Sequence, residues 1–403
     1  MSYDLPVGFR FAAVHAGIRP NTTKLDVSLI VSDVPAAAAG VYTQNKVFAA
    51  PVELDRARTP GEGFRAVVTN SGVANACTGE RGLADAKEMA RLAAAACGAS
   101  AEQALVLSTG VIGFFLPMEK IAAGIKAAAG KLERSEEMLV AAARGMMTTD
   151  TVQKLSGRTV ELSFGPVRVL GMAKGAAMIG PNMATMLGIV FTDAPLGAAL
   201  AQELLSAAVV DTFNCISVDG HMSTNDTVLL LANGAARPSA NTSVIPLAGD
   251  DLAKFRAALF EVCGELAKAI PADGEGATHL ITIDVNGCRT REDAHRIAKC
   301  VADSALVKTA IAGADPNWGR IVSAVGYAGV EFDPLDVELT VNGHLLYRRG
   351  APVQFDAATV SKAIRDHRDT SVVLKLTAGT ANVRFWTTDL TAEYVRLNAD
   401  YTT

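Results

Sequence analysis

The sequence is poor in aromatic residues and has no cluster of one charge. Phe, Trp and Tyr make up 5% of the 403 residues, whereas hydrophobic residues make up 50%. A core must therefore be built mainly from small and aliphatic side chains, and the chain is long enough for one large or two medium domains. The net charge of −5 is spread without a lysine or arginine run. This excludes the electrostatic pattern of a nucleic-acid-binding protein.

Long apolar segments are also missing. No stretch approaches the ~18 uninterrupted apolar residues of a membrane span. The first residues, MSYDLPVGFRFAAVHAGI, contain no basic region followed by an apolar run. We therefore expect a cytoplasmic protein with no membrane partner.

Cysteines and familiar catalytic motifs give little support to several common functions. The six cysteines are scattered, with no C-x-x-C pair, and no histidine cluster has the spacing of metal ligands. We expect reduced, mostly buried thiols and no metal site. Phosphate-binding loops, dinucleotide-binding loops, zinc-protease motifs and the α/β-hydrolase nucleophile motif are all absent from the sequence.

Hydrophobic periodicity predicts an α/β protein in which helices cover sheets. The N-terminal half is expected to contain helices at 83–97, 117–130 and 136–147 and strands at 26–31, 104–107, 159–163, 167–172 and 186–192. After Asp193 we expect helices at 196–210, 250–269, 291–308 and 357–366 and strands at 227–232, 279–285, 321–325, 336–340, 371–376 and 381–387. This second half is predicted to form a unit of its own.

The segment KGAAMIGPNMATMLGIVFTDA, at 174–194, places Thr185 after a Pro-containing turn and at the start of an apolar strand. A threonine hydroxyl is a weak nucleophile, and the free α-amine of a chain that begins with threonine can activate it. An internal threonine gains such an amine only by cleavage. The hypothesis is that Thr185 attacks the carbonyl group of Ala184 and that water opens the resulting ester. Two chains would result, 1–184 and 185–403.

That reaction needs fixed hydrogen-bond donors for its oxyanion, each typically worth about 3–4 kcal/mol. The segment LSTGVIG, at 107–113, offers Thr109 and Gly110 as candidates. From the residues alone, a simpler interpretation is favoured. In it, Thr185 is a half-buried strand threonine and residues 108–110 form an ordinary turn.

The segment at 174–194 resembles the self-cleavage segment of the ornithine acetyltransferase family, in which the cut falls between the Ala and the Thr of this motif. Further segments resemble the same family: LIVSDVPAAAAGVYTQNKVFAAPV at 29–52, NSGVANACTG at 70–79, LSTGVIG at 107–113, MTTDT at 147–151, STNDTVLLLANG at 223–234 and SALVKTAIAGADPNWGRIVSAVGYAG at 304–329. The resemblance extends nearly from end to end.

The resemblance implies a layered α-β-β-α sandwich of the L-aminopeptidase/ornithine acetyltransferase type, self-cleaved into chains 1–184 and 185–403. Thr185 would be the nucleophile and acetyl carrier, and Thr109 and Gly110 would form the oxyanion hole. The implied substrate-binding residues are Thr148, Lys174, Thr185, Glu275, Asn398 and Thr403. In chemical terms, Lys174 can pair with a substrate α-carboxylate and Glu275 with the ornithine ammonium group.

The implied reaction is a ping-pong transfer of acetyl from N2-acetyl-L-ornithine to L-glutamate through acetyl-Thr185. It yields L-ornithine and N-acetyl-L-glutamate in the cyclic pathway of arginine biosynthesis. The reaction requires no metal and no bound cofactor. Some family members also take acetyl-CoA as a donor, and no motif in this sequence decides whether this chain does. The implied assembly is a heterotetramer with two copies of each chain.

Four residues depart from the family pattern. Val73 stands where asparagine is usual, and Cys215, His221 and Met222 stand where arginine, aspartate and threonine are usual. These changes bear on specificity, while the cleavage motif is intact. Two alternatives stay open: an amidase or aminopeptidase of the same N-terminal-nucleophile fold, and an inactive relative that serves in binding or assembly. Ornithine release that depends on glutamate would distinguish the transferase from both.

Overall fold

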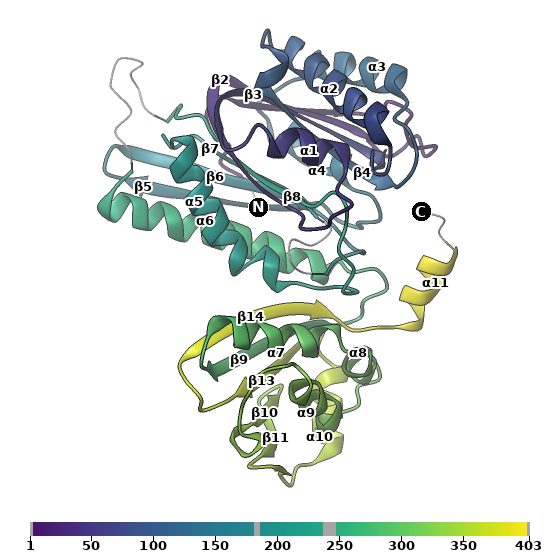
Figure 1. Ribbon diagram of the computed structural model, residues 1–403, viewed down its shortest axis with the longest axis vertical. Helices are drawn as coiled ribbons and strands as arrows, with labels where there is room; N and C mark the ends of the chain where they lie inside the picture. Colours follow the sequence, from purple (N-terminus) through teal and green to yellow (C-terminus); the bar gives the residue numbers. More distant parts are fainter. Residues whose placement is uncertain (1–2, 181–185, 237–246, 401–403) are drawn as a thin grey trace.

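The computed structural model describes residues 3–180, 186–236 and 247–400. Thr185, Ala184 and Thr403 therefore lie outside the described residues. Within these ranges the chain forms two bodies, each built on its own sheet (Figure 1). None of the helices in these ranges is long and apolar enough to cross a membrane.

The first body contains eight strands in one hydrogen-bonded sheet. They are β1 (Phe9–Val14), β2 (Val27–Tyr42), β3 (Gly61–Val73), β4 (Ala104–Val111), β5 (Lys154–Leu162), β6 (Gly165–Lys174), β7 (Leu187–Thr192) and β8 (Thr227–Ala232). The order is β4-β3-β2-β8-β7-β6-β5, and β1 pairs with β2 off this path. The long strand β2 pairs with β1 and β3 mainly through its first half and with β8 through its second half. It therefore passes from one layer into another.

Helices cover the outer faces of these two layers. These helices are α1 (Ala50–Arg56), α2 (Gly79–Ala95), α3 (Met118–Ala129), α5 (Ala198–Val210) and α6 (Gly249–Ala272). Helix α4 (Glu136–Met146) instead packs against the core between the layers, through Leu139, Ala142 and Met146. Helices α2 and α3 share a core with β2, β3 and β4, and α5 and α6 share another with β6, β7 and β8. A third core lies between the layers, with Val67 and Leu107 from one and Ile189 and Leu229 from the other. The expected α-β-β-α sandwich is thus confirmed (Figure 1).

Strand β8 shows why the sequence specifies two-sided burial. In TVLLLA, Val228 and Leu230 belong to the core beneath α5 and α6, whereas Leu229 and Leu231 belong to the core between the layers. Side chains alternate along a strand, so a continuous apolar run is expected where both faces are buried. The predicted strand at 227–232 is confirmed.

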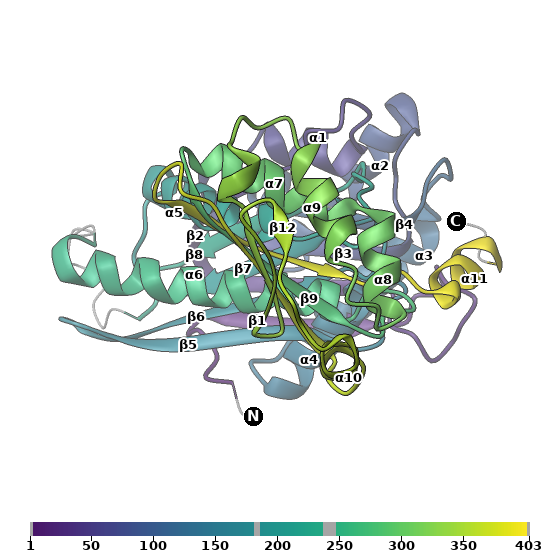
Figure 2. The same cartoon turned by 90° about the horizontal axis from the view of Figure 1, so that it is seen from below.

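The second body contains β9 (Leu280–Cys288), β10 (Glu338–Val341), β11 (His344–Arg348), β12 (Ala351–Pro352), β13 (Asp369–Lys375) and β14 (Ala381–Thr388), in the order β12-β11-β10-β13-β9-β14. Its helices are α7 (Arg291–Asp303), α8 (Ala305–Ala312), α9 (Trp318–Gly326) and α10 (Ala357–Arg365). The last helix, α11 (Ala392–Asp400), lies between the two bodies in Figure 1. Figure 2 shows it at the same edge of the molecule as α3 and α8.

The prediction of a strand at 321–325 is wrong, because these residues belong to α9. The side chain of Asn317 accepts a hydrogen bond from the backbone N–H of Arg320 and caps the helix. Ile321, Ala324 and Val325 are buried at helical spacing. A short apolar run with two valines fits either structure, and the preceding cap decides between them.

The single helix predicted at 291–308 is interrupted at Ser304. Helix α7 ends there, and the Ser304 side chain accepts from the backbone N–H of Val307 at 3.3 Å to start α8. Serine commonly begins helices in this way, because its hydroxyl replaces a missing backbone acceptor. One predicted helix is therefore two.

The prediction that residues after Asp193 form their own unit is also wrong. Strand β8, which follows Asp193, lies between β2 and β7 inside the first sheet, and the second sheet begins only at Leu280. Strand pairing is a non-local property, so a pattern read along the chain places a strand without naming its neighbours. The division into chains 1–184 and 185–403 is a separate prediction. It falls between β6 and β7, which pair antiparallel.

All six cysteines are free. Cys215, Cys263 and Cys288 are buried, Cys97 and Cys300 are half-buried, and Cys77 is exposed. Burial raises the pKa of Cys263 to about 12. The three buried thiols therefore act as small apolar side chains in the cores.

Candidate functional site

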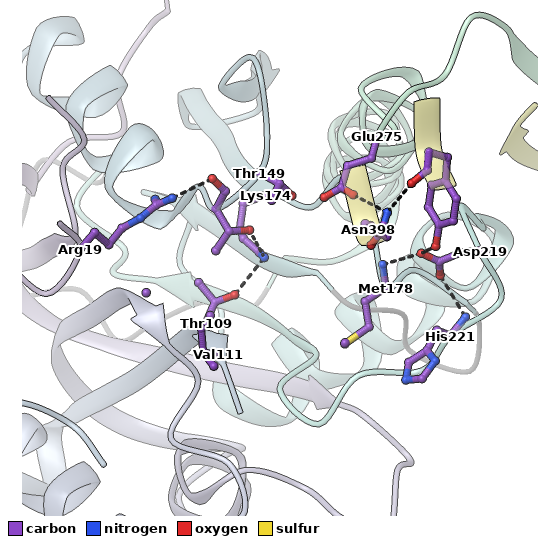
Figure 3. Close-up of a pocket in the computed structure, with 15 residues that line it drawn as sticks. Arg19, Thr109, Val111, Thr149, Lys174, Met178, Asp219, His221, Glu275 and Asn398 are labelled. Carbon is purple, nitrogen blue, oxygen red and sulfur yellow. Dashed lines mark hydrogen bonds between the residues drawn. The ribbon is translucent and has the colours of Figure 1, made fainter. Parts of the chain in front are cut away.

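A cavity of about 300 Å³ opens where the ends of β3, β4 and β6 meet the loop after α4 and the helix α11 (Figure 3). Six of the residues predicted for the site line it: Thr109, Gly110, Thr148, Lys174, Glu275 and Asn398. Because Thr109 and Gly110 are adjacent in β4, these residues come from five separate segments of the chain. The fold thus brings them around one space.

Lys174, the last residue of β6, is 4% exposed. Its Nζ donates to Thr109 Oγ1 at 2.9 Å and to Thr148 Oγ1 at 3.3 Å (Figure 3). Burial lowers the pKa of Lys174, and the nearby carboxylate of Asp150 opposes this shift. An ammonium has three donors. Within the described part of the chain, these two hydroxyls engage two of them, which leaves one for a ligand carboxylate.

Thr109 and Gly110 lie near the end of β4, beside this lysine. Because an ammonium can only donate, the Thr109 hydroxyl is the acceptor in its bond to Lys174 and keeps its own proton to donate. Gly110 has a φ of +135°, and a Cβ at this position would lie 2.2 Å from the carbonyl carbon of Gly72. Only glycine permits so close an approach of β3 and β4. The pair offers a hydroxyl and a backbone N–H at the cavity wall.

Asp226 fixes the chain on one side of residues 181–185. Its Oδ1 accepts from the backbone N–H of Met186 at 3.0 Å, and the N–H of Thr227 donates to the Met186 carbonyl at 3.1 Å. Burial raises the pKa of Asp226 well above its usual range, and the Met186 N–H opposes this shift. Met186, the covalent neighbour of Thr185, is therefore held through both of its backbone polar groups.

Asp219 fixes the chain on the other side. Its carboxylate accepts from the backbone N–H of Met178 at 2.7 Å (Figure 3). It also accepts from the backbone N–H of Ile179 at 2.8 Å and from the Tyr394 hydroxyl at 3.1 Å. Met178 has a φ of +57°, an uncommon conformation for a residue with a side chain. The two backbone bonds offset this strain. Burial, and then the charge of Asp219, raise the pKa of Tyr394.

Helix α11 closes the cavity. Asn398 Nδ2 donates to Glu275 Oε2 at 2.9 Å, and the backbone N–H of Glu275 donates to the Ala176 carbonyl at 2.9 Å. Gly276 has a φ of +67°, and a Cβ there would lie 2.5 Å from the backbone nitrogen of Tyr394. The C-terminal helix thus packs directly on the backbone that carries Glu275.

The substitution Gly276→Ala is expected to undock α11, because the added methyl group meets backbone atoms and the residue must keep a positive φ. Strain of this kind is worth about 1–3 kcal/mol, so α11 amides are expected to exchange at least ~10-fold faster in hydrogen-exchange measurements. Gly343→Ala is the control, since Gly343 has a φ of +82° but nothing within 4 Å of the Cβ position. Equal exchange of α11 in both variants would contradict the docking.

Arg19 also lines the cavity, although no motif pointed to it. Its guanidinium donates to the carbonyl groups of Met147 at 2.8 Å and Thr148 at 3.0 Å. The carboxylate of Asp26 in turn accepts from the backbone N–H groups of Ile18 at 2.8 Å and Arg19 at 3.1 Å. Arg19 therefore supports the loop that presents Thr148. These are contacts between distant segments, which sequence spacing does not reveal.

The four departures from the family pattern occupy different places. His221 lines the cavity, Val73 lies in the β3–β4 ladder opposite Thr109 and Val111, Cys215 belongs to the core of the second body, and the Met222 carbonyl accepts from Asn45 Nδ2 at 3.3 Å. Of the four, only His221 can meet a ligand in this cavity. In residues 3–180, 186–236 and 247–400, no group of three His, Cys, Asp or Glu side chains is placed to hold a metal ion.

Comparison with known proteins gives a match to the ArgJ family over residues 10–403. The arginine biosynthesis bifunctional protein ArgJ of Rhodopirellula baltica is 48% identical over 402 residues, which cover 100% of this chain and 97% of the relative. The protein of the same name from Geobacter sulfurreducens is 46% identical over 396 residues, covering 98% of this chain and 99% of the relative. The crystal structure of ornithine acetyltransferase complexed with ornithine, from Mycobacterium tuberculosis, covers 44% of this chain and 93% of that chain at 40% identity, with a TM-score of 0.41.

Proposed function

Since the chain belongs to the ArgJ family, we propose that it moves the acetyl group of N2-acetyl-L-ornithine to L-glutamate through an acetyl ester of Thr185. The chain is thus an acetyltransferase of arginine biosynthesis. One observation carries the assignment of the site. Lys174, with its two hydroxyl partners, pairs with Leu187 in the β6–β7 ladder, two residues after Thr185.

The proposed maturation uses the same groups as turnover. The Thr185 hydroxyl attacks the carbonyl carbon of Ala184, the peptide C–N bond breaks, and the α-amine of Thr185 becomes free. Water then hydrolyses the ester, which yields chains 1–184 and 185–403. In each addition step, the Thr109 hydroxyl and the Gly110 N–H would donate to the oxyanion.

In the proposed turnover, the free α-amine of Thr185 accepts the proton of its own hydroxyl as the oxygen attacks the acetyl carbonyl. Ornithine leaves with its α-amine protonated, and acetyl remains on Thr185. The α-amine of glutamate then attacks this ester and regenerates the hydroxyl. Thr109 and Gly110 again stabilise the charge that develops on oxygen.

We assign the two ends of the cavity to the two charged ends of acetylornithine. Lys174 and the Thr148 hydroxyl would bind the α-carboxylate, and Glu275, oriented by Asn398, would bind the side-chain ammonium. The family resemblance also implies that Thr403 binds the substrate. Glutamate carries the same α-carboxylate and α-amine, so the Lys174 end can hold both substrates in turn.

Release of ornithine from N-acetylornithine tests this function. Without glutamate, we expect one equivalent of ornithine per site and a chain beginning at Thr185 that gains one acetyl group. With glutamate, ornithine and N-acetylglutamate should accumulate in equal amounts. Acetate release at a rate independent of glutamate would identify an amidase instead, and an uncleaved chain that never gains acetyl would identify an inactive relative. The same assay with acetyl-CoA and glutamate decides whether acetyl-CoA is a second donor.

We further propose that two copies of each chain form a heterotetramer that acts in the cytoplasm. Each precursor has a mass of 41.9 kDa. The processed protein is therefore expected to show about twice this mass in a native measurement. A mass equal to a single precursor would contradict the assembly.

The alkaline limb of the pH profile is expected to report Lys174. Burial lowers the pKa of Lys174, so its charge is lost at a lower pH than that of an exposed lysine, near ~10.4. As the pH is raised, the KM for N-acetylornithine should therefore begin to increase before the pH reaches this value. The kcat should change less, because the contact between Lys174 and the carboxylate exists both before and during the reaction. Arginine stays charged, so Lys174→Arg should move this rise to higher pH. Coincident alkaline limbs in the two proteins would contradict the assignment.

A further inference from the structure

Three residues behind the cavity form a buried ionic bridge. The side chain of Lys154 is 1% exposed, and its Nζ lies 2.7 Å from Asp150 Oδ1 and 2.7 Å from Asp273 Oδ2. The Asp150 and Asp273 side chains are 0% and 8% exposed. Charged groups are rarely buried unless they are paired, and removal of one partner is strongly destabilising. None of the three residues lines the cavity, so the bridge has no direct role in ligand contact.

Asp150 connects the bridge to the carboxylate-binding end of the cavity. Its Oδ1 accepts from the backbone N–H of Gly175 at 2.6 Å, and its Oδ2 accepts from the backbone N–H of Thr148 at 3.1 Å. Gly175 directly follows Lys174. One carboxylate therefore fixes the backbone at both residues assigned to the substrate α-carboxylate.

Asp273 connects the bridge to the opposite end. It directly follows α6, and its Oδ2 also accepts from the backbone N–H of Thr151 at 3.0 Å. The Thr151 hydroxyl donates to the other carboxylate oxygen. Two residues later, Glu275 donates its backbone N–H to the Ala176 carbonyl at 2.9 Å. Asp273 thus fixes the start of the loop that carries the ammonium-binding carboxylate.

We propose that the Asp150–Lys154–Asp273 bridge sets the distance between the two ends of the cavity and thereby selects the side-chain length of the diamino-acid donor. These are positioning residues: Lys154 ties the backbone at Lys174 to the loop of Glu275. The inference rests on the proposed function and adds to it the origin of length specificity. The bridge also joins residues from both predicted chains, 1–184 and 185–403.

The charges determine which variants test the bridge. With Lys174 included, the buried group contains two carboxylates and two ammonium groups. Lys154→Met alone would leave an excess negative charge, which is costly in a buried site. Asp273→Asn leaves one excess positive charge, but it does so at the less buried carboxylate and keeps hydrogen-bonding groups there. The double variant Lys154→Met/Asp273→Asn leaves Asp150 opposite Lys174 with no net charge.

The test compares kcat/KM for three donors, the N2-acetyl derivatives of 2,4-diaminobutyrate, ornithine and lysine, which differ by one methylene each. Loss of a fixed geometry commonly costs one to two orders of magnitude in rate. We therefore expect Asp273→Asn to lower the preference for the ornithine derivative over each of the others by about 10-fold. The change should appear mainly in KM. The double variant should show the same loss of preference as Asp273→Asn. Thr151→Val, which removes only one outer hydrogen bond, should shift the preference less in the same direction.

Asp251→Asn is the matched control. Asp251 lies in the first turn of α6 and accepts from the backbone N–H of Ser163 at 3.0 Å and from the Ser163 hydroxyl, so it repeats the Asp273 contacts at the far end of the helix. At 1.5 Å per residue, this end is roughly 35 Å away. The control should keep the wild-type preference, and it should lose less thermal stability than Asp273→Asn, because Asp251 pairs with no buried lysine.

The outcomes separate the bridge from the proposed function. If Asp273→Asn and the double variant slow all three donors by the same factor, or if Asp251→Asn changes the preference equally, the bridge does not set length and the inference is wrong. If the wild type takes acetyl from none of the three donors, the proposed function itself is wrong. If only the bridge variants lose the preference for the ornithine derivative, the result supports both the bridge inference and the proposed function.

Discussion

Thr185→Ala is expected to give a single uncut chain of 403 residues with no measurable acetyl transfer. Without the hydroxyl, neither the attack on the Ala184 carbonyl nor the capture of acetyl can occur. Removal of a covalent nucleophile commonly lowers kcat by about 10⁴–10⁶. Intact-mass analysis should show two fragments, split between Ala184 and Thr185, for the wild type and one mass for the variant. After incubation with N-acetylornithine, only the wild-type fragment that begins at Thr185 should gain acetyl.

The control is Thr185→Ser, which keeps a hydroxyl and should therefore still cut and still carry acetyl, within about 10-fold of the wild-type rate. Neither variant removes the bonds that hold Met186 to Asp226 and Thr227, so both should unfold near the wild-type temperature. Cleavage in the alanine variant, or full transfer activity in an uncut chain, would show that another residue is the nucleophile.

Thr109→Val is expected to slow both self-cleavage and acetyl transfer by about 10²–10³, the usual effect of losing one oxyanion donor. Valine has nearly the same shape as threonine, so the packing of β4 is kept while the hydroxyl is lost. The ammonium of Lys174 also loses an acceptor at 2.9 Å. A rise in KM should therefore accompany the fall in kcat. Time courses of cleavage in fresh precursor and steady-state kinetics of mature protein measure the two effects separately.

Thr109→Ser provides the comparison, because serine keeps both the acceptor for Lys174 and the proton for the oxyanion. We expect it to cut and transfer within about 10-fold of the wild type. If the valine variant matures at the wild-type rate, the Thr109 hydroxyl does not stabilise the cleavage intermediate. If the valine and serine variants lose equal activity, the loss does not report the hydroxyl specifically, and the oxyanion role of Thr109 is not supported.

The sequence predicts which segments form buried strands and helices more reliably than it predicts which strands pair. The run TVLLLA at β8 indicates a strand buried on both faces, and the structure confirms it. The same run does not say that β2 and β7 are its neighbours, since those pairings depend on residues far away in the chain. The run IVSAV shows a different limit. Its apolar pattern fits a strand, and the cap at Asn317 makes it a helix.

The candidate site divides in the same way. Thr109, Thr148 and Lys174 were expected together because their segments resemble one family, and the structure places them within hydrogen-bonding distance. Asp219 and Tyr394 were not expected. They are 175 residues apart and act through backbone N–H groups and one hydroxyl. No spacing rule links such residues, because a backbone donor is present at almost every position.

The placement of β7 and β8 between β2 and β6 has a consequence for how the protein folds and refolds. If the chain is cut before Thr185, the adjacent inner strands β8 and β7 would belong to one polypeptide, and their neighbours β2 and β6 to the other. Each polypeptide alone would present unpaired apolar strand edges, which favour aggregation. Peptide linkage between the two is therefore needed once, while the sheet forms. The precursor would fold in a unimolecular reaction, whereas a cleaved protein, once unfolded, would have to reassociate from two aggregation-prone chains. We therefore expect its practical stability to be set by the rate of unfolding.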